Sequence, residues 1–449
     1  MKKCQNMTCR EHIEHETAIF CPFCGKYQVP AGWHFHGQPL NLKLSKDMGL
    51  DFGTAMPHSL KLDAKIHDCL MDGNILIVLH DGNVTAYDMS ASLLMGKPDI
   101  KWRETVGFPA KIVILRPYVI VIESGSIRGI HLETGDVYDF SKQIKKFDFF
   151  SDVDSIKILP VDRISGKKRK SVLIIANERE FAIFGFDGNN QLVKSVQKSP
   201  GFNAAILSLH IDDADPDAFF IYSRAGERAR IGIDECLENS ESEQIIISKD
   251  CIYKETENSL IGVEIAWVFS IEGVTYFLGI RNNGDTEFLR SDENGVEMIS
   301  NKLFNKKQPC AGISYPFILF ESGETNNRLY GYHLNNQQMI EYDFDSVKFF
   351  NIEGNKFRFY PDRLLYFFDK YWAVCPCHDS QMPFQLVSFD FRKDGSVDGE
   401  SCLYLNLPSP YGNSSNAVCG GNLFEMLPLI KGNNRIVSYV GDHLIIITG

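Results

Sequence analysis

The segment Asn74–Asp88, which reads NILIVLHDGNVTAYD, constrains most strongly what this chain can fold into. An apolar run rich in β-branched residues is interrupted by Asp81-Gly82, and a second run of alternating character follows. Glycine supplies the positive φ angle that a tight two-residue hairpin turn requires. The segment therefore predicts two antiparallel strands joined by a short hairpin.

Variants of this segment recur as far as the C-terminus, and self-similarity of this kind is typical of repeat architectures. Each unit contains an apolar strand, a second strand that ends near a turn, a third strand that often closes on an aromatic residue and Asp, and a more polar fourth strand. The pattern predicts an all-β fold, a β-propeller of eight blades, with seven blades as the alternative. The strands expected in the first unit are Lys65–Leu70, Ile75–Leu79, Val84–Tyr87 and Asp99–Arg103.

The last unit supplies only three strands, and the third of them, His443–Thr448, is strongly apolar. An apolar strand at the end of a chain would template aggregation if its edge stayed open. We therefore expect Leu40–Leu44 to pair with His443–Thr448 and to close the ring with both ends of the propeller. The resulting domain division is a small module over residues 1–30, a linker over 31–39 and the propeller over 40–449.

The overall charge argues against some classes of partner. The chain has 449 residues, with 58 acidic and 46 basic side chains, and its formal charge is -12. This balance disfavours a protein whose whole surface binds nucleic acid or anionic lipid. No apolar stretch approaches the ~20 residues that cross a bilayer, and the first residues lack the apolar core of a signal peptide. We expect a cytoplasmic protein whose 12 cysteines are reduced thiols or metal ligands.

Four cysteines near the N-terminus predict a zinc site. The pair Cys21 and Cys24 is followed by glycine, in the sequence FCPFCG, and a turn of this kind directs backbone amides at two thiolates. Cys4 and Cys9 supply a second pair with a wider spacing, and either His12 or His15 could replace Cys4. Thirty residues cannot bury enough surface to fold without such a cross-link. The predicted Zn2+ ligands are Cys4, Cys9, Cys21 and Cys24.

This segment resembles the small zinc-ribbon family over about the first 26 residues, and the wider first cysteine pair is its main departure. The resemblance implies a structural zinc ion. Over residues 1–30 there are four basic and three acidic side chains, so the charge balance is 4 − 3 = +1. Ribbons that bind nucleic acid carry a clear basic face. We therefore expect a structural or protein-docking ribbon.

Two sequence segments within the repeats resemble those of a known family. The sequence Ile130–Tyr138, IHLETGDVY, resembles the end of the repeat in quinoprotein-like (PQQ-like) β-propellers, and Asp81–Asp88 resembles the segment that precedes it there. The resemblance implies a propeller fold. The chain has only 4 tryptophans, and Trp102 alone follows a repeat at a plausible place. We therefore expect the tryptophan seams and the quinone chemistry of the enzymatic members to be absent.

Several other motifs have both a functional and an ordinary structural interpretation. The alternating carboxylates of Asp212–Asp217 could form a calcium loop, but Ala214 stands where such loops have glycine, which favours an acidic turn. The remaining motifs are interpreted as buried strand cysteines (Cys375, Cys377 and His378), a basic hairpin tip or contact with an anionic partner (166–170), a flexible loop (412–421), and linker side chains packed on the propeller (His34 and His36).

No catalytic set emerges from the sequence. It contains no G-x-S-x-G elbow, no phosphate-binding G-x-x-x-x-G-K-[ST] loop and no H-E-x-x-H spacing. We expect a non-catalytic protein-interaction scaffold with protein partners and no nucleic-acid or membrane partner, either a monomer or a subunit of a hetero-complex. The alternatives are an enzyme or small-ligand sensor that uses the central channel, and nucleic-acid binding through the zinc ribbon.

Overall fold

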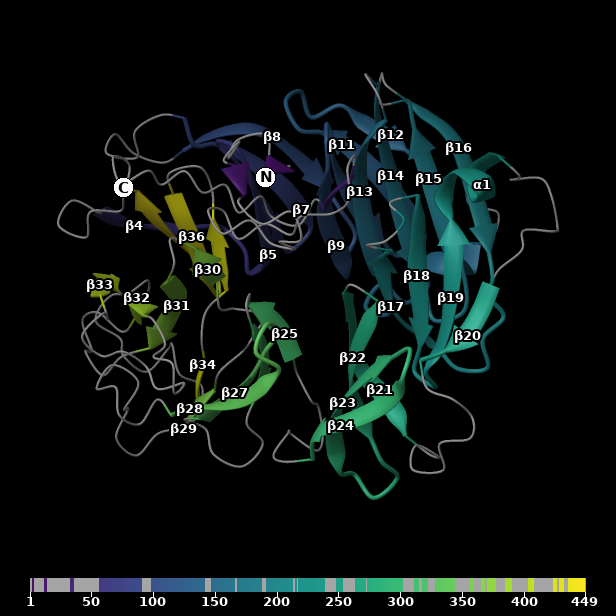
Figure 1. Cartoon of the computed structure of the whole chain (residues 1–449). Helices are drawn as coiled ribbons and strands as arrows, with labels where there is room; N and C mark the ends of the chain where they lie inside the picture. The colour runs from purple at the N-terminus through teal and green to yellow at the C-terminus, as the bar shows by residue number, and fades with distance from the viewer. Residues whose placement is uncertain are drawn as a thin grey trace.

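The architecture comes from a computed structural model of the whole chain (Figure 1). The structure describes the propeller strands together with three short N-terminal strands. The described residues are 2–3, 12–13, 33–35, 56–90, 98–141, 147–165, 168–187, 191–212, 215, 217–238, 248–252, 263–271, 273–301, 311–314, 317–321, 328–343, 356–358, 365–367, 370–376, 384–389, 403–407, 423–425, 428–431 and 435–448.

The first half of the propeller contains four antiparallel sheets whose strands follow one another in chain order. Sheet 1 consists of β5 (Ile66–Asp72), β6 (Ile75–His80), β7 (Asn83–Asp88) and β8 (Asp99–Thr105). Sheet 2 consists of β9 (Ala110–Leu115), β10 (Tyr118–Glu123), β11 (Ser126–His131) and β12 (Val137–Asp139). Sheet 3 contains β13 (Lys157–Ser165), β14 (Lys168–Ala176), β15 (Phe181–Phe186) and β16 (Leu192–Lys198), and sheet 4 contains β17 (Ile206–Ile211), β18 (Ala218–Ser223), β19 (Glu227–Gly232) and β20 (Ser248–Cys251).

The second half repeats the same arrangement. Sheet 5 consists of β21 (Glu264–Ile271), β22 (Val274–Ile280), β23 (Thr286–Asp292) and β24 (Gly295–Ser300). Sheet 6 consists of β25 (Ala311–Ser314), β26 (Phe317–Glu321), β27 (Arg328–His333) and β28 (Gln338–Asp343). Sheet 7 contains β30 (Leu365–Phe367), β31 (Lys370–Pro376), β32 (Phe384–Phe389) and β33 (Leu403–Leu407), and sheet 8 contains β35 (Leu429–Lys431), β36 (Arg435–Val440), β37 (His443–Thr448) and β4 (Met56–Lys61).

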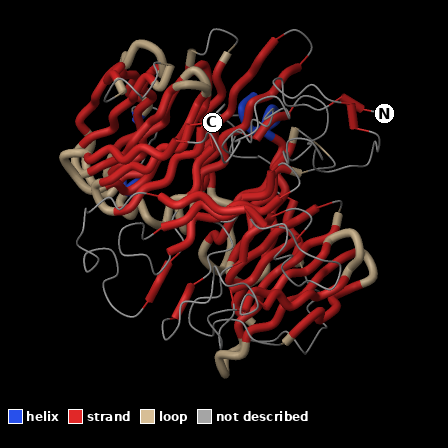
Figure 2. The backbone as a smooth tube through the Cα atoms, turned by 90° about the vertical axis from the view of Figure 1, so that its left-hand side faces the viewer, coloured by secondary structure: helices blue, strands red, loops and turns tan. Residues whose placement is uncertain are grey.

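The sheets are arranged as the blades of a ring (Figure 1). The first strands of sheets 8, 1, 2, 3, 4 and 5 contact one another in succession, so these strands line the axis. The apolar core lies between the sheets: six hydrophobic clusters each join two neighbouring sheets, from the pair 8 and 1 to the pair 5 and 6. Strands form nearly all of the regular structure (Figure 2). The predicted all-β architecture of repeated four-stranded units is confirmed.

This packing explains why the second strand of a unit is apolar without interruption. All six residues of β6 are buried. Ile75 and Ile77 contribute to the core between sheets 1 and 2, whereas Leu76 and Val78 contribute to the core between sheets 8 and 1. Side chains alternate between the two faces of a strand, and both faces are covered here. The turn after β6 is the predicted hairpin, in which Gly82 has a φ of 76°.

The ring closes with a different strand from the one expected. The edge of β37 that does not pair with β36 pairs antiparallel with β4, and Leu444 lies opposite Leu60. The prediction that Leu40–Leu44 pairs with His443–Thr448 is therefore wrong, although a strand from the N-terminal part does pair there. The physical reason is burial: Leu60 and Leu62 join the core between sheets 8 and 1. Leu40–Leu44 lies outside the described residues.

A few elements were not expected from the sequence. A short strand in the linker, β3 (Trp33–Phe35), pairs with β13 and adds a fifth strand to sheet 3. The helix α1 (Ile233–Glu238) packs against β15, β16 and β19. The remaining elements are a 3-10 helix, Phe147–Phe150, a parallel pair of β29 (Lys356–Arg358) with β34 (Leu423–Glu425), and an antiparallel pair of β1 (Lys2–Lys3) with β2 (His12–Ile13). Within the described part, no helix has the length and apolar character to cross a membrane.

Candidate functional site

The predicted zinc ligands Cys4, Cys9, Cys21 and Cys24 all lie outside the described residues. The backbone nevertheless gives one relevant observation near them. Lys3 pairs with His12 between β1 and β2, so the ends of a segment that contains Cys4 and Cys9 lie side by side. Elsewhere in the described part of the chain, no group of three His, Cys, Asp or Glu side chains is arranged to hold a metal ion. Zinc binding stays a prediction.

An arginine of the protein pairs with two carboxylates of the acidic segment 212–217. The Arg230 guanidinium lies 2.7 Å from a carboxylate oxygen of Asp212 and also pairs with Asp215. The backbone amide of Asp217 donates to the Asp215 carboxylate at 3.0 Å, as in an Asx turn. Two of the carboxylates that a calcium ion would need are thus bound to an arginine. This geometry favours the interpretation as an acidic turn.

The other motifs singled out in the sequence lie in strands or outside the described residues. Ser165 pairs with Lys168, so β13 and β14 are antiparallel neighbours on either side of the basic run, whose residues Gly166 and Lys167 lie outside the described residues. Cys375 lies in β31, and Cys377 and His378 lie outside the described residues. The same is true of the loop 412–421. His34 belongs to β3, where it lies opposite Asp162, so this part of the linker does contact the propeller.

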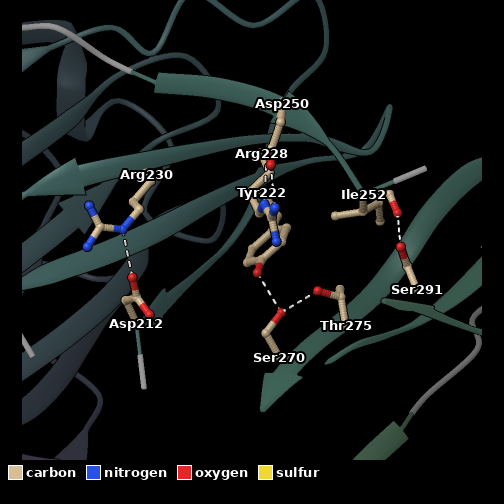
Figure 3. A network of polar contacts seen from close by, with 9 residues as sticks. All are labelled: Asp212, Tyr222, Arg228, Arg230, Asp250, Ile252, Ser270, Thr275 and Ser291. Carbon is tan, nitrogen blue, oxygen red and sulfur yellow. Dashed lines mark hydrogen bonds and ion pairs between the residues drawn. The ribbon is translucent and has the colours of Figure 1, made fainter. Parts of the chain in front are cut away.

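A polar network connects sheets 4 and 5 (Figure 3). The Tyr222 hydroxyl shares a hydrogen bond of 2.5 Å with Ser270 Oγ, which shares another of 2.9 Å with Thr275 Oγ1. Burial raises the pKa of Tyr222, so its hydroxyl stays protonated. Arg228 pairs with Asp250 on the neighbouring strand. The network satisfies polar groups between two packed sheets, which is a structural role.

His210 lies beside this network and is held neutral. Its ring makes edge contacts with Tyr222 and Phe269, at centroid distances of 5.5 and 6.4 Å, and its Nε2 lies 3.1 Å from Ser208 Oγ. Burial lowers the pKa of His210 to about 4. The imidazole is therefore a neutral packing group at physiological pH.

We expect the stability of the protein to fall on acidification because of His210. Above about pH 6.5 this residue is neutral in both the folded and the unfolded chain, and between about 6.5 and 4 only the unfolded chain binds the proton. The contribution of His210 to the free energy of unfolding is therefore fully present above about pH 6.5 and is lost as the pH falls from about 6.5 to 4. Urea unfolding of the wild type and of His210→Gln at pH 7.5, 5.5 and 4.5 measures it. The variant should lose less stability between pH 7.5 and 4.5, and equal pH dependence of both proteins would contradict the assignment.

Exposed apolar side chains concentrate on the first two sheets. Among the described residues, five large apolar side chains are exposed, and four of them, Ile100, Phe108, Val137 and Tyr138, lie in sheets 1 and 2 or in the connection between them. The fifth, Met298, lies on β24 of sheet 5. Contiguous exposed apolar groups mark interaction sites on soluble proteins. Three of the four, Ile100, Val137 and Tyr138, lie on the last strands β8 and β12, whereas the ring of Phe108 lies 4.2 Å from that of His67 on β5. The outer side of sheets 1 and 2 is therefore the candidate functional surface.

The two exposed side chains of β12 each have a neighbour on another strand of sheet 2. Tyr138 packs edge-on against Tyr118, at a centroid distance of 5.3 Å, and Tyr118 in turn contacts Phe140 and Phe186. Val137 lies opposite Ile130, which belongs to the core between sheets 1 and 2. The two exposed side chains of β12 therefore face different neighbouring sheets. The sequence placed a strand here but gave no sign that its side chains would be exposed.

Trp102 fixes sheet 1 to the turn that precedes β12. Its indole Nε1 donates to the carbonyl of Leu132 at 2.8 Å, and its side chain covers Gly135. A Cβ on Gly135 would lie 2.7 Å from Trp102 Cβ. Trp102, the tryptophan singled out in the sequence, thus joins sheets 1 and 2. It lies beside the candidate surface and determines the position of β12.

Comparisons with known proteins bear only on the fold. No protein-family model matches the chain, and no curated protein matches it. Among solved structures, the WD40 domain of SCAP from fission yeast is similar, with 8% identity over 88% of this chain and 98% of that chain and a TM-score of 0.43. The AfRom2 CNH domain has 10% identity over 75% and 100% of the two chains, with a TM-score of 0.40. The Pan2 WD40 domain of Neurospora crassa has 7% identity over 86% and 89%, with a TM-score of 0.37.

Proposed function

We propose that this protein is a non-catalytic interaction scaffold: an eight-bladed propeller that holds a protein partner on the outer side of sheets 1 and 2. The observation that carries the proposal is the concentration of exposed large apolar side chains on β8 and β12, which hold three of the five in the described part of the chain. Burial of these side chains against a partner would stabilise the complex by about 25 cal/mol per Å² of apolar surface removed from water. We further propose that the protein works as a monomer or as a subunit of a hetero-complex.

The proposal is tested by capturing partners with a surface variant. Ile100→Ser, Val137→Ser and Tyr138→Ser are combined in one chain, and Met298→Ser serves as the matched control. Ile100 and Met298 both lie on the last strand of their sheets and are both 51% exposed. After crosslinking in native lysate, the triple variant should capture about tenfold less partner protein than the wild type. The control should capture the same amount as the wild type. Equal capture by the two variants would overturn the proposal.

We propose in addition that residues 1–30 form a zinc ribbon, with Zn2+ held by Cys4, Cys9, Cys21 and Cys24. The pairing of Lys3 with His12 supports it, because it brings together the ends of the segment that contains the first two cysteines. The same proposal places the protein in a reducing compartment, the cytoplasm, and the buried free thiols Cys69 and Cys236 fit that setting.

Elemental analysis should find about one zinc per chain. The double variant Cys21→Ser/Cys24→Ser should lose this zinc, because two thiolate ligands are removed from a four-ligand site. The described core clusters of the propeller are built from residues of its own sheets, so we expect its thermal transition to be unchanged. Cys69→Ser, a change to a buried thiol in the core between sheets 8 and 1, is the control that should keep zinc. Zinc that persists in the double variant would show that other ligands hold it.

A further inference from the structure

The backbone of β12 directs hydrogen-bonding groups away from its sheet. The amide of Phe140 donates to the carbonyl of Ile127 at 3.0 Å, and the amide of His131 donates to the carbonyl of Asp136 at 2.8 Å. In an antiparallel pair, every second residue faces the partner strand, so Asp136, Tyr138 and Phe140 belong to the set that faces β11. The N–H and C=O of Val137 therefore point to the opposite side, the outer edge of sheet 2.

Among the outermost strands of the sheets in the described part, β12 carries two exposed large apolar side chains, Val137 and Tyr138, whereas β8 and β24 carry one each. On sheet 2, no strand of the described part pairs with the outer side of β12. An open strand edge with apolar side chains is a template for a further strand.

The chain shows that a sheet of this ring accepts a fifth strand. The linker strand β3 pairs antiparallel with β13, and Phe35 lies opposite Val161. Only three residues are needed to form that pair, and β12 has the same length. An extended segment of similar length would thus fit along β12.

Charge around β12 defines the chemistry of such a segment. Val137 is preceded by the exposed Asp136, and Glu133 lies in the turn before it. The neighbouring Asp99 on β8 is exposed as well. Lys101 Nζ lies 2.5 Å from the Glu133 carboxylate, so these two charges neutralise each other, and the negative charge beside Val137 comes from Asp136 and Asp99. A partner with Lys or Arg between apolar residues would complement this surface.

We propose that the outer edge of β12 binds an extended peptide segment as an added strand, through the backbone of Val137 and through apolar and basic side chains of the peptide. Main-chain hydrogen bonds supply affinity in this mode of recognition, and the side chains on alternate positions supply specificity. The inference rests on the proposed scaffold function and names the partner class of that same surface.

Fluorescence anisotropy on the purified full-length protein tests the inference with labelled synthetic peptides. The probe is an eight-residue peptide that alternates lysine and valine, and the comparison peptide alternates glutamate and valine. We expect the basic peptide to bind about tenfold or more tightly than the acidic one, with affinity that falls as salt rises. Methylation of alternate backbone nitrogens blocks the N–H groups along one edge of the peptide. Methylation of the edge that pairs with β12 should abolish binding, and methylation of the opposite edge should not.

Val137→Pro is the decisive variant, because it removes the outward N–H and leaves the bonds between β11 and β12 in place. This variant should bind the peptide about tenfold more weakly and keep the thermal transition of the wild type. Val137→Thr, which keeps the N–H, should bind the peptide as tightly as the wild type does. Equal binding by the wild type and Val137→Pro, or by methylated and unmethylated peptides, would overturn strand addition. If the triple serine variant loses its protein partner while no peptide binds, the scaffold proposal stands and this inference falls. If the triple variant keeps its partner, the scaffold proposal itself fails.

Discussion

Deletion of residues 1–61 is expected to produce a destabilised protein that aggregates, whereas deletion of residues 1–50 should leave a folded monomer. The longer deletion removes β4, the strand that pairs with His443–Thr448, and with it the buried Leu60. Burial of a leucine contributes about 2 kcal/mol, and each lost backbone hydrogen bond costs about 1 kcal/mol. We therefore expect a loss on the order of 3–5 kcal/mol.

The loss of β4 also opens an apolar edge. Leu444, Ile445 and Ile446 are buried in the complete ring. In the longer deletion their strand would present unpaired N–H and C=O groups beside apolar side chains, which favours association between chains. Thermal unfolding and light scattering of the two truncated proteins measure both effects.

The shorter deletion is the control, because it removes the N-terminal module and the whole linker with β3, as the longer one does, but keeps Met56–Lys61. A synthetic peptide spanning residues 54–63 should restore part of the stability of the longer deletion when it is added in excess. Equal melting temperatures and equal monomer content for both truncations would show that β4 does not close the ring.

The substitution Gly135→Ala is expected to lower the free energy of unfolding by about 2–4 kcal/mol. Gly135 has a φ of 78°, which costs an L-amino acid roughly 1–2 kcal/mol. The added Cβ would also lie 2.7 Å from Trp102 Cβ, within a contact that joins two sheets. The indole is anchored by its bond to Leu132, so it cannot move away freely. Urea unfolding of the wild type and the variant measures the difference.

Gly82→Ala separates backbone strain from the packing clash. Gly82 has a φ of 76°, close to that of Gly135, but a Cβ there would meet no atom within 4 Å. This control should cost only about 1 kcal/mol. In a Trp102→Gly background, which removes the clashing Cβ together with the indole, the cost of Gly135→Ala should fall to the same level. If the two alanine substitutions are equally costly in the wild type, the contact between Trp102 and Gly135 contributes nothing.

Much of the strand order could be predicted from the sequence, because its signals are local. The expected strand Ile75–Leu79 corresponds to β6 (Ile75–His80), and the turn at Asp81-Gly82 lies where the hairpin was placed. A strand buried on both faces is a short apolar run bounded by turn residues, and neither feature depends on distant parts of the chain. The sequence also favours an acidic turn over a calcium loop at 212–217, because glycine is missing where a calcium loop needs it.

The pairing that closes the ring was assigned to the wrong strand for a physical reason. Leu40–Leu44 reads LNLKL and alternates as a strand should, whereas Met56–Lys61 reads MPHSLK, so local pattern favours the segment that does not pair there. The choice depends on which segment meets the core between sheets 8 and 1, and that core collects residues such as Met71 and Val437 from opposite ends of the chain. The linker strand β3 escaped notice for the same reason, since its partner β13 lies far along the sequence.

The candidate surface depended still more on tertiary structure. Val137 and Tyr138 have the composition of core residues, and only the position of β12 as the last strand of its sheet leaves them exposed. The sequence by itself determined the strands, their hairpins and the four-strand rhythm, because these follow from periodicity and turn chemistry within a few residues. Tertiary structure decided which strand closes the ring, which glycine accommodates Trp102 and which apolar side chains reach solvent, because each of these depends on contacts between residues that are distant in the chain.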